Sequence, residues 1–164
     1  MENKAGIPQI IILAISLLMP LLSIAQDYEE SITNYSEKFL TYSQSFVNHA
    51  SQNVNTDVEY DAALALSDIA EEFHQHTSYL GDYLLILKII NKHEVEKELA
   101  QRLVRLRIES IIKECNAALE GIGAATANVE SESITAMAND LSGDLEALKK
   151  VLTKINDQFS GTER

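Results

Sequence analysis

Apolar side chains recur at alternating steps of four and three residues through four successive segments of this chain. In the first segment the pattern is formed by Tyr28, Ile32, Tyr35, Phe39, Tyr42 and Phe46. This repeat keeps one apolar seam on a single helix face, which is typical of coiled coils and four-helix bundles. The four segments cover about residues 27–51, 57–90, 93–120 and 132–159. We therefore predict an all-α fold, an antiparallel up-and-down four-helix bundle that forms one domain over residues 26–164.

The residues that interrupt helices agree with these boundaries. Glycine and proline are scarce, with 6 Gly and 2 Pro in 164 residues, and neither proline lies in the predicted bundle. Thr56 or Asp57 can cap the second helix. Residues 91–93 form a short connection, and Gly121 with Gly123 weakens the end of the third helix. Short connections make successive helices antiparallel neighbours.

The first 25 residues have the organisation of a secretory signal peptide. A weakly positive start precedes an apolar run over residues 7–22, and small residues occupy positions 23 and 25. Asp27 follows, so the charge changes sign across the run. We predict cleavage after Ala25 and export to the periplasm or the extracellular space. The alternative is an uncleaved anchor, because a helix over residues 7–25 is about 28 Å long and can span a bilayer.

The charge of the chain restricts its partners. The formal net charge is −12, which disfavours binding to nucleic acids and to anionic lipid surfaces. The distribution is uneven: residues 26–81 contain 10 acids and 1 base, whereas residues 82–118 contain 6 acids and 7 bases. The simplest interpretation is that the third helix pairs with acidic neighbours. The alternative is a basic docking face that includes Arg102, Arg105 and Arg107.

The histidines give the only hint of a metal site. Glu71 and His74 match the E-x-x-H spacing of di-iron bundles, but the chain contains no second copy. His74 lies off the apolar stripe, so we expect it to face solvent. His76 lies on the stripe, and Glu72 is four residues before it, which makes this pair a weak candidate for metal ligands. The simpler expectation is a partly buried His76 that hydrogen-bonds to Tyr35 or to a helix carbonyl.

The sequence contains no motif typical of a nucleophilic enzyme or of a cofactor-binding protein. There is no G-x-S-x-G elbow, no phosphate-binding glycine loop, no H-E-x-x-H and no haem-attachment motif. Cys115, the only cysteine, falls on the stripe of the third helix, so we expect a core residue. We predict no enzymatic activity and no cofactor.

Two surfaces remain as candidate binding sites. The first is a ligand groove between the first two helices, lined by Tyr35, Phe39, Tyr42 and residues 66–73. The second is the apolar tip of the hairpin around Asn91, which we expect to project past the first helix. Its predicted partner-binding residues are Leu84, Leu85, Ile86, Ile89, Val95 and Leu99. The alternative is that the second helix breaks near Gly81 and folds the tip back.

Together these features predict an exported, non-enzymatic helical bundle that acts through protein–protein contacts, with a partner protein or a second copy of itself. After cleavage of the signal it has no membrane segment. The alternative function is a small-ligand or metal-binding bundle that uses Glu72, His76 and the tyrosines of the first helix.

Overall fold

The structure of the chain is a computed structural model. It describes the backbone of residues 7–52, 54, 56–90 and 94–160, and the side chains of residues 28–52, 54, 56–87, 89 and 98–159. Within these ranges the chain forms four α-helices and no strand, which confirms the predicted all-helical fold. The helices are α1 (Ile7–Gln52), α2 (Asp57–Ile90), α3 (Glu94–Thr126) and α4 (Glu132–Ser160).

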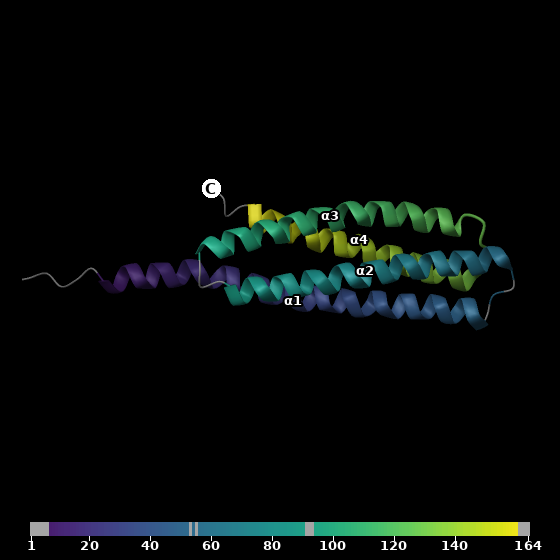
Figure 1. The fold of residues 1–164 in the computed structure, drawn as a ribbon, viewed down its shortest axis with the longest axis horizontal. Helices are drawn as coiled ribbons and strands as arrows, with labels where there is room; N and C mark the ends of the chain where they lie inside the picture. Colours follow the sequence, from purple (N-terminus) through teal and green to yellow (C-terminus); the bar gives the residue numbers. More distant parts are fainter. Residues whose placement is uncertain (1–6, 53, 55, 91–93, 161–164) are drawn as a thin grey trace, which may run out of the picture.

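The four helices lie side by side, and each reverses the direction of the one before it (Figure 1). Each helix contacts the next one along the chain, α4 also contacts α1, and α2 contacts α4 across the middle. At one end of the molecule α4 stops first, and α3 extends past it. The first part of α1 continues beyond all the others (Figure 1).

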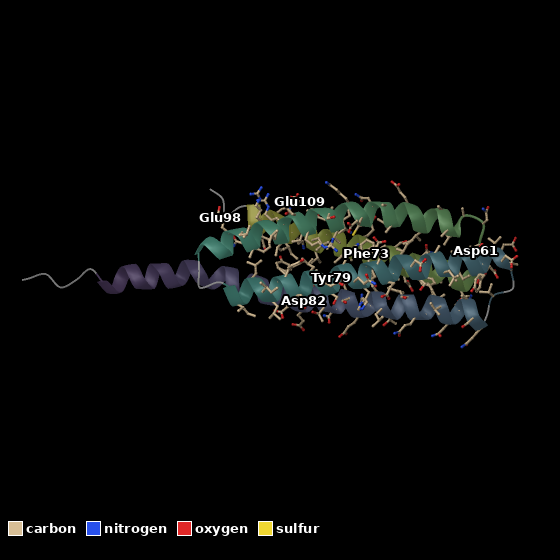
Figure 2. All side chains as sticks on the ribbon, in the orientation of Figure 1. Asp61, Phe73, Tyr79, Asp82, Glu98 and Glu109 are labelled. Carbon is tan, nitrogen blue, oxygen red and sulfur yellow. The ribbon has the colours of Figure 1, made fainter. Side chains whose placement is uncertain are left out.

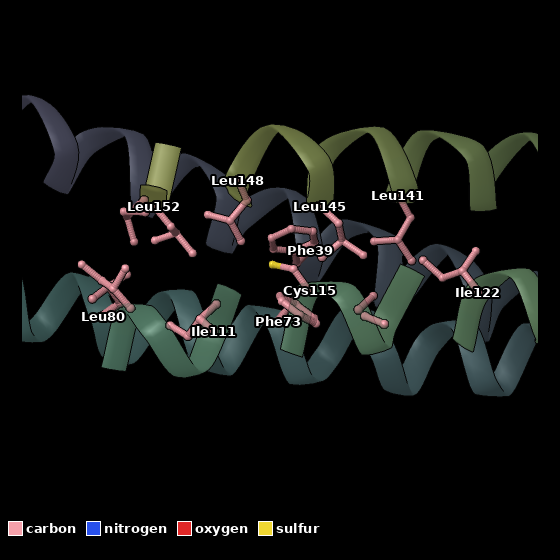
Figure 3. Close-up of a cluster of buried hydrophobic side chains, with 14 of the residues drawn as sticks. Phe39, Phe73, Leu80, Ile111, Cys115, Ile122, Leu141, Leu145, Leu148 and Leu152 are labelled. Atoms are coloured by element: carbon pink, nitrogen blue, oxygen red, sulfur yellow. The ribbon is translucent and has the colours of Figure 1, made fainter. Parts of the chain in front are cut away.

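The apolar stripes of all four helices meet along the long axis and form the core (Figure 3). Its largest fully buried side chains are Phe39, Phe46, Phe73, Ile32, Leu66, Leu80, Leu84, Ile108, Ile111, Ile134, Leu141 and Leu145. Most of these residues belong to the three–four repeat. Burying such a stripe, at about 1.5–3 kcal/mol for each large side chain, is the main source of helix stability in a bundle.

Small residues let α1 and α2 pack closely. Ser36 and Ser43 on α1, and Ser67 and Thr77 on α2, are buried although they are polar. The hydroxyls of Ser43 and Ser67 lie 3.2 Å apart, and Thr77 donates to the carbonyl of Phe73 at 2.6 Å. These hydrogen bonds satisfy the hydroxyls inside the core.

Two expectations about glycine are corrected by the structure. Helix α3 continues through Gly121 and Gly123 to Thr126 instead of ending near residue 120. A Cβ at Gly121 would lie 3.4 Å from Ile69 Cδ1, about an ordinary van der Waals contact, so this position of α3 faces α2. Helix α2 passes Gly81 without interruption to Ile90, so the alternative with a break near Gly81 is wrong.

Helix α1 begins at Ile7 rather than near residue 27, and it runs without a break across the predicted cleavage position. The prediction that the α2–α3 hairpin projects past the first helix was made for a chain cleaved after Ala25, and it stays a prediction. In the full chain the first part of α1 continues beyond the ends of α2 and α3 (Figure 1). In the part of the chain whose side chains are described, no helix combines the length and apolar content needed to cross a membrane.

Candidate functional site

His76 is the centre of a polar cluster between α2 and α3. Its Nε2 lies 3.2 Å from Glu72 Oε1, one turn earlier on α2, and 3.0 Å from Glu114 Oε2 on α3. Its Nδ1 contacts the guanidinium of Arg107 on α3. Ser110 donates to the other oxygen of Glu114 at 2.8 Å. The structure thus brings Glu72 and His76 together and adds three residues of α3.

The partners of His76 assign its tautomer. An arginine only donates hydrogen bonds, so Nδ1 accepts from Arg107. The proton is then on Nε2, where it faces the two carboxylates. The edge of the imidazole also meets the ring of Phe73, with centroids 5.7 Å apart and planes at 83°. The side chain is 16% exposed, and both ring nitrogens contact polar side chains, so the imidazole bridges α2 and α3.

This geometry limits the chemistry of the cluster. Both ring nitrogens already have protein partners, and the guanidinium of Arg107 places a positive charge beside the ring. Among the residues whose side chains are described, no group of three or more His, Cys, Asp and Glu is arranged to hold a metal ion. Ser110 bonds to Glu114 and not to His76, so the three residues are not ordered as nucleophile, base and acid.

Two expectations about the histidines were wrong. His74 does not face solvent: its Nδ1 lies 2.9 Å from Ser36 Oγ and 3.0 Å from the Ser36 carbonyl, between α1 and α2. His76 does not bond to Tyr35 or to a carbonyl, because its partners come from α2 and α3. Tyr35 instead stacks on Phe39, and its pKa is raised, chiefly by burial.

A second polar cluster joins α1 to α4. Asp144 accepts hydrogen bonds from Lys38 Nζ at 2.7 Å and from Tyr42 Oη at 2.9 Å. Burial, reinforced by Asp144, raises the pKa of Tyr42 far above its ordinary value of 10.0. The carboxylate therefore fixes the neutral phenol and ties the two helices together.

The predicted groove between α1 and α2 is filled by core side chains. Phe39, Leu66 and Phe73 are fully buried, and the rings of Phe39 and Phe73 lie 5.7 Å apart. Cys115 is also fully buried, which confirms its predicted place in the core. Burial raises the pKa of its thiol from 9.0 to about 12.

The predicted partner-binding tip is divided by the structure. Leu84 is 1% exposed and belongs to the core, so its assignment to the surface was wrong. Leu85, Ile86, Ile89 and Leu99 are exposed. The side chain of the sixth predicted residue, Val95, lies outside the described part of the chain.

Further exposed apolar residues, missed in the prediction, extend this surface along α2 and α3. Six side chains, each between 43% and 61% exposed, form what we name the α2–α3 strip: Tyr79, Tyr83, Ile86, Leu99, Leu103 and Leu106. On α2 they are separated by four and three residues, and on α3 likewise. At about 100° per residue, such steps place the three side chains on one face. The same spacing could have revealed them in the sequence.

The register of the two helices brings the two halves of the strip together. His76 meets Glu114, and Gly121 faces Ile69, so α2 and α3 run antiparallel with a fixed offset. That offset places Ile86 near the level of Leu103. Figure 2 shows Tyr79 on α2, with Glu98 and Glu109 on α3 towards the same end of the molecule. The strip therefore runs from the His76 cluster towards the α2–α3 hairpin.

The α3 side of the strip borders a groove of about 630 Å³ between α3 and the end of α4. Its lining residues are Glu98, Gln101, Arg102, Arg105, Leu106, Glu109 and Phe159. Leu106 belongs to both surfaces. Leu85, by contrast, lines a smaller groove with Glu29 and Thr33 of α1, so it lies on a different side of α2.

Comparison with protein-family models, curated proteins and solved structures finds no match.

Proposed function

We propose that this protein is an exported helical bundle that acts through protein–protein contacts made by the α2–α3 strip. The observation that carries the proposal is the pair of outward-facing stripes on α2 and α3, each with the four–three spacing of a helix-packing seam. Single exposed apolar residues are ordinary, but a contiguous row of six on neighbouring helices is typical of an interaction surface.

The finer architecture belongs to the same proposal. Helices that alternate in direction around seams with heptad spacing favour an up-and-down bundle with coiled-coil-like packing. Such a bundle presents side chains on rigid helix faces, so the strip needs no folding step before a partner binds.

Export rests on the N-terminal sequence alone. The apolar run and the small residues at positions 23 and 25 support cleavage after Ala25. After such a cleavage the shortened α1 begins near the level of Leu84 on α2. The last residues of α2 then extend past the new end of α1. Mass spectrometry of protein recovered outside the cytoplasm tests this: a mature chain that begins at Gln26 supports export with cleavage. An intact chain retained in the membrane supports the anchor.

The alternative function, a ligand- or metal-binding bundle, has less support. Glu72 and His76 do meet, but Arg107 occupies Nδ1 and the carboxylates face the proton on Nε2. A metal would have to displace that proton and lie near a guanidinium.

Site-specific photocrosslinking tests the proposed function in the producing cell. A photoreactive amino acid replaces Leu103 in the strip, and in the control it replaces Val47, which is 48% exposed on α1. We expect a discrete crosslinked species from position 103 and none from position 47. The proposal fails if the two positions give the same pattern or if neither gives a product.

A further inference from the structure

Building on the proposed function, we infer that the occupant of the α2–α3 strip is a second copy of this chain, in a two-fold symmetric and reversible dimer.

Self-complementarity is the first argument. The α2 half of the strip (Tyr79, Tyr83 and Ile86) and the α3 half (Leu99, Leu103 and Leu106) have the same spacing, and the two helices run antiparallel. A two-fold axis parallel to the helices places each α2 half on the α3 half of the other copy. Every pair of packed helices is then antiparallel, as it is within one copy. This is the isologous arrangement that a closed dimer requires.

Charged residues at the edges of the strip favour a two-fold axis parallel to the helices over one perpendicular to them. Asp82 is exposed on α2, and Arg102 is exposed on α3. Packing α2 on the other copy's α3 places the two Asp82 carboxylates at opposite edges of the contact, each on the side of the other copy's Arg102. A perpendicular axis stacks α2 on α2, which brings the two Asp82 carboxylates to the same edge and is opposed by their repulsion.

The distribution of charge disfavours dimer contacts through other faces of the molecule. Residues 26–81 and 119–164 carry net charges of −9 and −4, whereas residues 82–118 carry +1. Asp61 lies on α2 at the end opposite Glu98 (Figure 2). Two copies of an acidic protein repel one another over most of their surface. Two copies approach without net repulsion at residues 82–118, the region that contains most of the strip. The net charge of this region is close to zero, so it does not attract a strongly acidic partner protein in particular.

The size of the strip predicts the strength of the contact. Six large side chains, each about half exposed, offer roughly 500 Å² of apolar surface per copy, against about 800 Å² of total surface per partner in an interface of standard size. With its polar edges the strip approaches that size. We expect a dimer that dissociates in the micromolar range rather than an obligate one.

Sedimentation velocity tests the inference on protein that is expressed as the whole chain and recovered after export. The measurements run from about 2 µM to about 200 µM protein, a range that brackets a micromolar dissociation constant. Wild-type protein is compared with Leu103→Glu, which places a charge at the centre of the strip. Val47→Glu is the matched control because it adds the same charge to an exposed apolar position away from the strip. Circular dichroism establishes that each variant is folded, and Ile86→Lys replaces Leu103→Glu if that variant unfolds.

We expect concentration-dependent dimerisation of the wild type and of Val47→Glu, and a dimer at least about a hundredfold weaker for the strip variant. A wild type that is monomeric at the highest concentration overturns the inference, and so does a strip variant that dimerises normally. The crosslinking experiment separates the two proposals. A strip that captures a different protein leaves the proposed function standing and overturns the dimer, whereas a strip that captures nothing overturns both.

Discussion

The thiol of Cys115 makes the stability of the fold sensitive to alkaline pH. The side chain is fully buried on α3 among core residues of the other helices (Figure 3). Burial raises its pKa from 9.0 to about 12, because a thiolate in the core loses its hydration. The unfolded chain therefore releases this proton near pH 9, while the folded chain keeps it until about pH 12.

The sign and the size of the effect follow from this difference. Below pH 9 both states hold the proton, and the full stability is present. Above pH 9 ionisation favours the unfolded state, and the free energy of unfolding falls by up to about 1.4 kcal/mol per pH unit until the folded thiol also ionises. Between pH 8 and pH 10 the expected loss is about 1.4 kcal/mol. Tyr42, whose pKa is also raised, adds a similar loss only above pH 10.

Urea denaturation followed by circular dichroism measures this effect, with Cys115→Ala as the matched variant. At pH 7 the variant should be less stable by about 1 kcal/mol, because a small cavity replaces the sulfur. The difference should shrink steadily above pH 8 and vanish or reverse by pH 10, since alanine does not titrate. A difference that stays constant from pH 7 to pH 10 would refute the buried, protonated thiol.

Three further predictions follow from single contacts. A double-mutant cycle between Tyr42→Phe and Asp144→Ala, measured by urea denaturation, should give a coupling energy of about 1–2 kcal/mol; additive effects would mean that this hydrogen bond does not stabilise the fold. Gly143→Ala should raise the free energy of unfolding by about 0.5–1 kcal/mol, because a Cβ there meets nothing within 4 Å; a loss would contradict the open environment. His76→Ala should destabilise by about 1–3 kcal/mol, because Arg107 and Glu72 each lose a hydrogen-bond partner; an unchanged urea midpoint would contradict the bridge.

Helix number and core were predictable from the sequence because both depend on local spacing. A residue such as Phe39 or Leu145 is marked as buried by its place in a repeat, without knowledge of its neighbours. Glycine was harder to interpret. Gly121 weakens a helix by intrinsic propensity, yet α3 continues through it to Thr126, because packing against neighbouring helices stabilises a helix more than local propensity does.

The polar clusters were less predictable because their members come from different helices. Glu72 and His76 could be paired because they are one turn apart on one helix. Arg107 and Glu114 become their partners only through the offset between α2 and α3, which depends on packing. The offset between α1 and α2 explains the error at His74 in the same way: Ser36 is 38 residues away in sequence and is small enough to let the imidazole fit between the two helices.

The strip and the core have a common origin in the sequence. On α2 the buried positions Leu80, Leu84 and Leu87 are each preceded by one strip residue, so the helix carries two apolar seams side by side. A bundle needs only the first seam, and a second seam exposed to water favours association. The net negative charge of the rest of the chain opposes most encounters between copies, whereas residues 82–118, which contain most of the second seam, carry a net charge of +1. A larger apolar surface would aggregate in many orientations, whereas one narrow seam, with Asp82 at one edge and Arg102 at the other, favours one orientation. We therefore interpret the charge of −12 and the exposed strip as two parts of a single arrangement that restricts association to one face.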